Sequence, residues 1–471
     1  MRRGWIAAAA VVVIAGCSTS EPATPVSTPP MQRNFTAGAD GIGDGYFPTY
    51  GNGGYDVAGY DLKLRFNPGT GELGGTATVT ATATQNLSSF NLDLAGLTVS
   101  AVTVDRATAR FAAARNELTI TPATGIVDKT RFTAVIDYAG TPGPIGNETL
   151  GKGGWLRTED GGFALGQPES ASTWFPVNDH PSDKATFKLA MTVPDGVEAI
   201  SNGVPGGSTT TAGWTTWTWT ETAPLASYLS FVAIGRYRVE STTHLGKPMV
   251  IAIPESLPAD GPAAKTMART GEITDFLATQ FGPYPFDAYG AVVIDDERVG
   301  YALETQSRPV YGSTFFQGGE NDGVVAHELA HQWFGDSVAL ERWEDIWLNE
   351  GFATYAEWLW AEHGGRTTAQ QIFDRQYASF DWKQTPGRPG TAGLFGEAVY
   401  IRGGMTVHAL RKTIGDPAFF GLLKSWPAQY ANGNATTADF IAAAEKAAGG
   451  KKLGPFFDSW LYGKTKPSPV S

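Results

Sequence analysis

His327 and His331, two histidines four residues apart, are the side chains of this sequence best suited to metal chemistry. They belong to the segment HELAH, which lies in a run with helical periodicity. Because residues four apart lie on one face of a helix, both imidazoles can reach a single ion. Neutral imidazole is a good ligand for zinc, which accepts a tetrahedral site with one open position. Glu328 follows the first histidine, and its carboxylate can accept a proton from water at that ion.

A third ligand is expected from Glu350, which follows His331 after a spacer of eighteen residues and begins the next predicted helix. A carboxylate from an adjacent antiparallel helix completes a His–His–Glu set and leaves the fourth position open. Thr354 lies one helical turn later, where its hydroxyl could orient a ligand or simply pack. Asp345 and Glu357 are further candidates beside the ligands, but we expect both at the surface.

Helical periodicity dominates the chain after about Ser241. Five segments are expected to be helices: Ala264–Gln280, Asp322–Phe334, Asn349–His363, Met405–Ile414 and Thr437–Ala448. The second is expected to be capped by Asn321 or Asp322 and to end at Gly335. A short apolar run, Ala291–Ile294, predicts a strand before the metal helices. Residues 241–471 are therefore interpreted as an α-rich domain with a small sheet.

Alternation with period two dominates the part before it, from Tyr55 to about Val239. Apolar and polar residues alternate from Tyr60 to Phe66 and again from Trp214 to Thr222. The runs NPG at 67–69 and PGG at 205–207 are expected to be turns between such strands. Residues 46–240 are therefore predicted to form an antiparallel β domain, which makes the fold class α+β and multidomain.

The first residues have the features of an export signal. Arg2 and Arg3 precede an apolar run, Trp5–Ala15, that is shorter than the roughly 20 residues a membrane-spanning helix needs. The run ends in IAGC, which resembles a bacterial lipobox. We expect residues 1–16 to be removed and the thiol of Cys17 to carry lipid, with palmitate among its acyl chains. The alternative is an ordinary secretory signal with an accidental cysteine.

Residues 17–45 are rich in Ser, Thr, Pro and Gly, and they are expected to form a flexible tether. With Cys17 as the anchor, the protein is expected to be exported and held at the outer face of the cell membrane. Because Cys17 is the sole cysteine, disulfides within the chain and zinc sites built on several thiolates are excluded. A net charge of −12 without a basic stripe argues against nucleic acid as a partner. No obligate protein partner is evident.

The motifs together resemble the aminopeptidase N family, which consists of gluzincin zinc exopeptidases. The resemblance runs from about Tyr55 to the end of the chain and is carried first by HELAHQWFG at 327–335 and WLNEGFA at 347–353. It implies a saddle-like β sandwich followed by a thermolysin-like catalytic domain. It also implies that His327, His331 and Glu350 bind one zinc ion and that Glu328 is the general base.

The same resemblance implies how substrate is held. The run YALET at 301–305 takes the place of the family's Gly-Ala-Met-Glu-Asn signature, with Tyr301 and Thr305 as departures. Glu304 then matches the carboxylate that binds the substrate's free α-amine, and Ala302 lies beside it. The segment QPE at 167–169 matches a stretch that lends Gln167 and a second acid, Glu169, to the site.

Tyr400, in the run YIRGG, resembles the family tyrosine that donates a hydrogen bond to the tetrahedral intermediate. The resemblance thus implies an aminopeptidase that removes the first residue of peptides with a free N-terminus. A zinc endopeptidase or oligopeptidase is the nearest alternative, and epoxide hydrolysis is a further one within the family. A surface lipoprotein that binds peptides without cleaving them is the alternative outside enzymes.

Overall fold

The computed structural model describes residues 1, 4–5, 7–13, 15–16, 33–147 and 151–468. The chain divides into a short unit, Met1–Asn34, and a compact unit, Phe35–Ser471. The described residues of the first unit form no helix or strand. Cys17, the expected lipid anchor, lies outside the described residues. Across the described ranges, no helix has the length and apolar character needed to cross a membrane.

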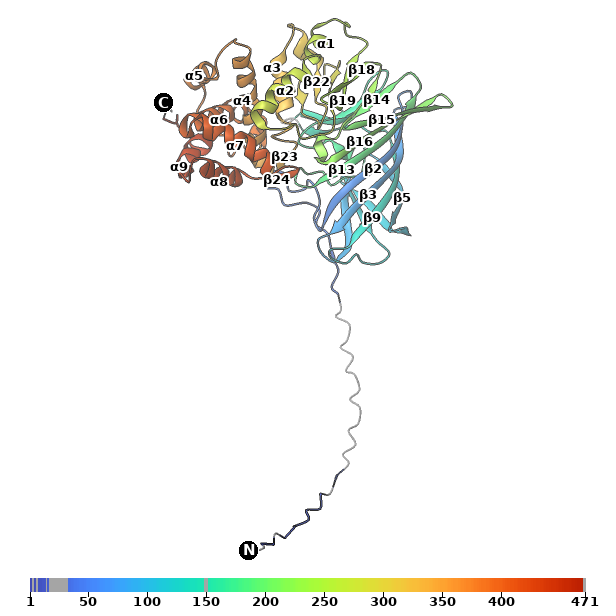
Figure 1. Cartoon of the computed structure of the whole chain (residues 1–471). Coiled ribbons are helices and arrows are strands. Elements are labelled where there is room, and N and C mark those ends of the chain that lie inside the picture. The colour runs from blue at the N-terminus through green and yellow to red at the C-terminus, as the bar shows by residue number, and fades with distance from the viewer. Residues whose placement is uncertain (2–3, 6, 14, 17–32, 148–150, 469–471) are drawn as a thin grey trace. The chain divides into compact units, whose positions relative to one another are not determined.

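The N-terminal half of the compact unit is built of three sheets, seen on the right of Figure 1. The largest has eight strands in the order β15-β16-β13-β2-β3-β9-β5-β6. Their bounds are β2 Tyr55–Asn67, β3 Glu72–Ala83, β5 Thr98–Val104, β6 Ala107–Thr108, β9 Arg131–Gly140, β13 Lys184–Pro194, β15 Val204–Thr211 and β16 Trp214–Ala226. All neighbours in it are antiparallel except β13 and β2, which run parallel.

Two smaller sheets cover this large sheet. One has the order β1-β4-β8-β7, and the other β10-β11-β12-β17-β14. Their strands are β1 Thr36–Ala37, β4 Leu87–Asp93, β7 Arg110–Ala114, β8 Glu117–Thr121, β10 Pro144–Asn147, β11 Gly151–Arg157, β12 Gly162–Leu165, β14 Glu198–Ser201 and β17 Val232–Gly235. Phe66 of the large sheet contacts Trp155 of β11 at 4.8 Å between ring centroids, and Phe132 contacts Phe90 of β4 at 5.0 Å. These aromatic contacts form a core between layers.

The burial of β2 shows why this half folds as sheets. Its buried residues include Tyr60, Leu62, Leu64 and Phe66, at the alternation that the sequence predicts. The NPG run at 67–69 lies in the turn between β2 and β3, where the Gly71 amide donates to the Asn67 carbonyl at 2.7 Å. The expected turn at 205–207 is wrong, because these residues lie inside β15 at a register shift. The connection to β16 is made instead by Ala212 and Gly213, both with positive φ.

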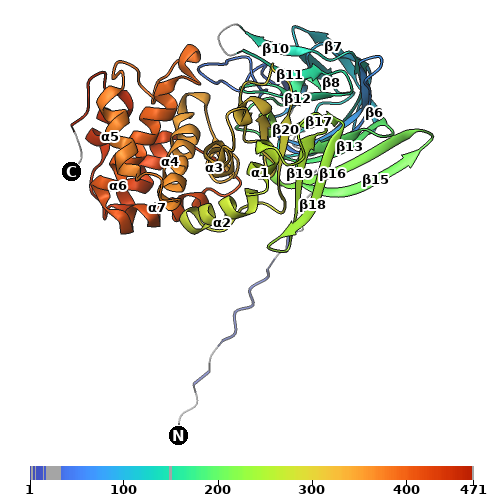
Figure 2. The ribbon, with the colours of Figure 1, turned by 90° about the horizontal axis from the view of Figure 1, so that it is seen from above.

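The C-terminal half carries the helices, which gather on the opposite side in Figures 1 and 2. Its helices are α1 Pro262–Met267, α2 Thr270–Phe281, α3 Asp322–Ala330, α4 Trp347–His363, α5 Ala369–Ser379, α6 Gly403–Ile414, α7 Asp416–Gln429, α8 Thr437–Ala447 and α9 Gly454–Phe457. Its larger sheet has the order β18-β19-β20-β22-β21, and β23 pairs with β24. These strands are β18 Tyr237–His244, β19 Lys247–Pro254, β20 Tyr289–Ile294, β21 Ala302–Leu303, β22 Val310–Gly312, β23 Val338–Leu340 and β24 Gly433–Ala435.

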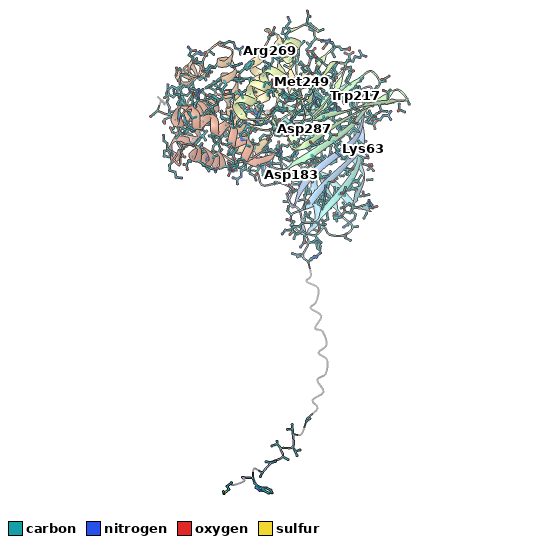
Figure 3. All side chains as sticks on the ribbon, viewed as in Figure 1. Lys63, Asp183, Trp217, Met249, Arg269 and Asp287 are labelled. Atoms are coloured by element: carbon teal, nitrogen blue, oxygen red, sulfur yellow. The ribbon has the colours of Figure 1, made fainter. Side chains whose placement is uncertain are left out.

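The expected helices are present, with shifts at their ends; the expected end of one at Gly335 is wrong, because α3 ends at Ala330 with His331 as its C-cap. The segment predicted as one helix over 264–280 is broken into α1 and α2 at Ala268 and Arg269. Figure 3 labels Arg269 at this break, on the helical side, and Lys63 on β2 of the large sheet. β17 is the last strand along the chain to join a sheet of the N-terminal half, and β18 is the first to join the sheet of the C-terminal half. This change lies close to the expected end of the β domain at residue 240.

Residues 35–45, which we expected in the tether, belong to the compact unit. β1 pairs with β4, and the buried carboxylate of Asp44 accepts hydrogen bonds from the amides of Phe47 at 3.0 Å and Trp343 at 2.9 Å. The same carboxylate lies 3.3 Å from Nε2 of His180. The composition of this stretch resembles a linker, but Asp44 has fixed partners in both halves of the unit.

Candidate metal centre and substrate pocket

Two adjacent helices, α3 and α4, carry the expected metal ligands (Figure 2). Asn321 caps α3, accepting from the Val324 amide at 3.4 Å. Helical spacing then places His327 and His331 on one face. Oε2 of Glu350, from α4, lies 3.2 Å from Nε2 of His327 and 3.5 Å from Nε2 of His331. The ligand atoms of the three side chains all lie within 4.8 Å of one another.

The other ring nitrogen of each histidine has its own partner. Nδ1 of His327 lies 2.6 Å from Oε1 of Glu357, and Nδ1 of His331 lies 3.0 Å from the carbonyl oxygen of Phe334. These contacts orient both rings with Nε2 toward Glu350, which is how metal-binding histidines are commonly held. Our expectation that Glu357 serves only at the surface is therefore wrong. Glu357 lies on α4 two turns after Glu350 and reaches back to the ligand.

Two other residues considered beside the ligands have different surroundings. The hydroxyl of Thr354 is buried and has no hydrogen-bond partner among the described residues, and its methyl group packs near Gly404. Asp345 is buried, so our expectation of a surface position for it is wrong, and it accepts a hydrogen bond from the amide of Thr437 at 3.2 Å, at the start of α8. Both side chains thus support the packing of α4 and its neighbours rather than the metal ligands.

The three expected ligands compensate one another's charge. Burial alone would raise the pKa of Glu350, but His331 and His327 outweigh it and lower that pKa to about 2. Burial alone would lower the pKa of His331, but Glu304 and Glu350 raise it to about 9. Two imidazole nitrogens and one carboxylate oxygen converging in a buried place are the donors that zinc takes. The residues present therefore fit a zinc ion.

Glu328 and Tyr400 lie beside the three expected metal ligands. Glu328 is 5% exposed, and burial raises its pKa to about 8 against the opposing effect of His327 and His331. Tyr400 belongs to a π-helical turn, Ala398–Arg402, and its ring stacks on that of His327 at 6.0 Å between centroids. Arg402 fixes this turn by donating to the carbonyl oxygens of Trp460 at 2.8 Å and of other residues. A buried carboxyl group and a tyrosine hydroxyl thus flank the metal ligands.

Glu304 lies directly after β21, and its carboxylate is 2% exposed. Oε1 accepts a hydrogen bond from the hydroxyl of Tyr228 at 3.0 Å and one from Nε2 of Gln167 at 3.4 Å. Burial raises the pKa of Glu304, and the field of His331 opposes that effect. One carboxylate, held by two neutral donors, therefore provides the negative charge at this end of the site.

One cavity of about 380 Å³ is lined both by the expected metal ligands and by Glu304, and we call it the substrate pocket. It is lined by Gln167, Gly300, Tyr301, Ala302, Glu304, Phe315, Asn321, Val324, His327, Glu328, His331, Glu350, Glu357 and Tyr400. Every residue expected to bind the metal, to act in catalysis or to bind substrate, except Glu169, lies in this lining. Of the two departures, Tyr301 lines the pocket, where its ring and that of Phe315 add aromatic surface to a mostly polar lining.

Glu169 is the expected site residue that the structure does not bring to the pocket. It lines a separate cavity of about 770 Å³, together with Asp93 and Glu117, and its Oε1 accepts from the hydroxyl of Tyr50 at 2.7 Å. Burial raises the pKa of Glu169 to about 7. The QPE segment therefore contributes the amide of Gln167 to the substrate pocket and directs its carboxylate elsewhere. Its spacing alone did not reveal which of the two polar residues faces the pocket.

Two residues that hold Glu304 were missed in the sequence. Tyr228 lies in a 3-10 turn, Ser227–Leu229, in the β half, and Gln332 directly follows the ligand His331. No local spacing connects Tyr228 to position 304, because the two meet only through the packing of the halves. Gln332 lies inside the motif HELAHQWFG, but the motif does not indicate that its side chain contacts the backbone of Glu304.

Comparison with known proteins places this arrangement in a family. Residues 57–229 match the peptidase M1 N-terminal domain, and residues 266–460 match the peptidase family M1 domain. A crystal structure of the M1 zinc metallopeptidase from Deinococcus radiodurans is 31% identical with a TM-score of 0.84, over 92% of this chain and 99% of that one. The chain therefore belongs to peptidase family M1.

A substrate complex of the same bacterial enzyme and a mammalian protein are also similar to this chain. A variant of the Deinococcus radiodurans enzyme, solved with a Tyr-Ser-Ala substrate, has a TM-score of 0.84 at 30% identity and again covers 92% of this chain and 99% of that one. Aminopeptidase N of Canis lupus familiaris is 32% identical over 216 residues, which are 43% of this chain and 22% of the dog protein. The chain thus spans about a fifth of the length of that curated relative.

Proposed function

We propose that this protein is a zinc-dependent aminopeptidase that hydrolyses the first peptide bond of peptides with a free N-terminus. The observation that carries the proposal is the shared pocket of Glu304 and the His327–His331–Glu350 set. An anionic group beside a metal centre can bind the α-ammonium group of a substrate while the adjoining peptide bond lies at the metal. The similarity to dog aminopeptidase N and to the Deinococcus radiodurans enzyme with its Tyr-Ser-Ala substrate supports the same activity.

Zinc bound by the three ligands would supply Lewis acidity toward a substrate carbonyl and toward water. Glu328 takes a proton from the attacking water and later returns it to the leaving amine. Its burial in the lining of the pocket suits it to this exchange, because burial raises the pKa of the carboxyl group and so favours uptake of the proton from water. The hydroxyl of Tyr400 donates to the oxygen on which negative charge develops.

The amine end of the pocket positions the substrate. Glu304 binds the ammonium group, and the amide oxygen of Gln167 can accept a further ammonium hydrogen while its nitrogen stays with Glu304. A substrate whose amine is acylated carries no charge for Glu304 and leaves that carboxylate buried without a partner. Such a mismatch costs on the order of several kcal/mol, so a blocked substrate is disfavoured.

The experiment uses matched pairs of fluorogenic aminoacyl substrates, free or N-acetylated, with and without a zinc chelator. We expect free-amine substrates to be cleaved, acetylated ones to react at least about 100-fold more slowly, and the chelator to abolish activity until zinc is restored. Equal rates for a free and a blocked peptide would instead indicate the endopeptidase. Peptide binding without cleavage, in a zinc-loaded protein, would indicate a binding protein.

We also propose that Cys17 carries a lipid that holds the protein at the outer face of the cell membrane. The support is the IAGC run after an apolar segment, with the sole cysteine at its end. Labelling of expressing cells with a palmitate analogue should mark the wild-type protein, and Cys17→Ser should remove the label and release the protein from the membrane fraction. A label that survives this substitution contradicts the proposal.

A further inference from the structure

Tyr228 is a residue of the β half that contacts the amine end of the substrate pocket. Its hydroxyl donates to Oε1 of Glu304 at 3.0 Å, and its side chain is 1% exposed. The ring is fixed by Trp343, with centroids 5.4 Å apart at an interplanar angle of 58°. Since a buried carboxylate has little water to solvate it, a fixed donor of this kind stabilises its charge and its orientation.

Gln332 holds the backbone of the same residue. Its Nε2 donates to the carbonyl oxygen of Glu304 at 3.0 Å, and its Oε1 accepts from the amide of Ser307 at 2.7 Å. Ser307 has φ of 66°, in the left-handed region, so the turn after Glu304 adopts a conformation that needs support from its surroundings. Gln332 itself is fully buried and directly follows His331, one of the zinc ligands.

These contacts tie the amine-binding carboxylate to the metal helix. Tyr228 restrains the side chain of Glu304, and Gln332 restrains its backbone relative to His331. In an aminopeptidase the bond to be cleaved lies one residue from the bound amine. The distance between Glu304 and the metal ligands therefore decides which peptide bond reaches the metal, and small displacements of reacting groups are costly.

We propose that Tyr228 and Gln332 are positioning residues that together fix Glu304 relative to the metal ligands and thereby set the register of the substrate's N-terminus. This inference rests on the proposed function, because it requires that Glu304 bind the α-ammonium group. Neither side chain lines the substrate pocket, so both act through Glu304.

The first test is Tyr228→Phe, which removes the donor and keeps the ring against Trp343. Losing a hydrogen bond to a charged group should raise KM for free-amine substrates about 10- to 100-fold. We expect kcat to change less than about threefold, because the groups at the reacting bond are untouched. Zinc content should equal that of the wild type.

Tyr138→Phe is the matched control. Tyr138 is also a buried tyrosine of the β half, and its hydroxyl donates to the carbonyl oxygen of Trp174 at 2.8 Å, away from the substrate pocket. Each Tyr→Phe variant loses one buried hydrogen bond, so we expect both to have a similarly lowered thermal stability. Only Tyr228→Phe should raise KM. A similar rise in KM in both variants would mean that general loosening, and not the contact with Glu304, is responsible.

The second test is Gln332→Met, which keeps the length of the side chain and removes both hydrogen bonds. Products from an unblocked pentapeptide would be identified by mass spectrometry. The wild type should release single residues, and the variant should release dipeptides in a fraction at least about 10-fold higher, since its anchor can shift. Zinc content is measured in parallel, to show that His331 still binds the metal.

The outcomes separate this inference from the proposed function. If the wild type itself cleaves acetylated and free substrates equally, the proposed function fails and no variant is needed. If the wild type discriminates while Tyr228→Phe keeps the wild-type KM and Gln332→Met releases only single residues, the positioning roles are overturned. Should Tyr228→Phe fail to fold, the product pattern of Gln332→Met decides alone.

Discussion

The two ends of the substrate pocket are assembled in different ways. The metal end comes from α3 and α4, and all of its ligands and the supporting Glu357 lie between residues 327 and 357. The amine end brings Gln167 and Tyr228 of the β half to Glu304, and Gln332 braces it from behind. The expected metal ligands therefore meet through the packing of two adjacent helices, whereas the side-chain contacts of Glu304 form only once the two halves have packed.

The electrostatics of the two ends differ as well. At the metal end, charged groups of opposite sign compensate one another, and the donor set suits a dication. At the amine end, one buried carboxylate is stabilised by the neutral donors Tyr228 and Gln167. Substitutions at the first end should therefore change zinc content, and substitutions at the second should change KM while zinc stays bound.

The largest effect is expected for Glu350→Ala. Removing the carboxylate leaves two histidines, which do not hold zinc as a three-ligand set does, so activity should fall at least about 10³-fold, to the level of the chelated enzyme. Zinc content and kcat/KM are measured together. Glu362→Ala, a half-exposed residue on the same helix, is the control and should keep both. Full zinc content in Glu350→Ala would contradict the ligand assignment.

Tyr400→Phe should lower kcat about 10²- to 10³-fold, since a donor to developing negative charge is lost. The ring remains, so its stacking on His327 should persist. We expect zinc content to be unchanged and KM to stay within about threefold. A variant with wild-type kcat would remove Tyr400 from the chemical step and leave it a packing role.

Glu357→Gln tests the support of the metal end. The amide keeps an oxygen near Nδ1 of His327 but loses the charge, so zinc should bind about 10- to 100-fold more weakly. Competition with a chromogenic chelator measures this affinity. At saturating zinc, kcat should approach the wild-type value. Unchanged zinc affinity would mean that the 2.6 Å contact contributes nothing to metal binding.

Glu169→Gln should have the smallest kinetic effect. Glu169 lies in the cavity beside Asp93 and Glu117, outside the substrate pocket. We expect KM and kcat for free-amine substrates to stay within about twofold of the wild type, in contrast to the effect of Tyr228→Phe. An increase in KM of about 10-fold or more would show that this acid also binds the amine, and would return it to the role that the family resemblance implies.

The same substitution should change how stability depends on pH. Burial raises the pKa of Glu169 from 4.5 in the unfolded chain to about 7 in the folded protein. Its stabilising contribution is therefore complete below pH 4.5 and is lost as the pH rises through 7. Relative to the wild type, Glu169→Gln should gain about 1–3 kcal/mol in free energy of unfolding between pH 5 and pH 8. Urea denaturation at both values checks this, and an equal difference at both would contradict it.

Much of the fold and the metal end could be predicted from the sequence, because their signals are local. Alternation identified β2, and the helical run at 322–334 placed His327 and His331 on one face. The break between α1 and α2, and the shift of Pro205 into a strand, depend on partners distant in the chain. The parallel pairing of β13 with β2 likewise has no signature in either strand alone.

The amine end was predicted only in part, for a related reason. Glu304 and Gln167 were found through motifs, but motifs did not distinguish the residue that faces the pocket from its neighbour Glu169. Tyr228 had no signal, because its partner lies 76 residues away and in the other half. Glu357 was expected at the surface, and its side chain is partly exposed, but one of its oxygens lies 2.6 Å from Nδ1 of His327, a contact that no local pattern in the sequence indicates.

The contact between Asp44 and the amide of Trp343 has a practical consequence for producing a soluble fragment. Cutting the chain at residue 46, where composition suggests that folding begins, would remove the carboxylate that accepts from Trp343 and Phe47. Those amides would be left buried without an acceptor. A fragment that begins at Phe35 retains β1 and Asp44. Phe35 is therefore the start point at which we expect the enzyme to be expressed as an intact, protease-resistant body.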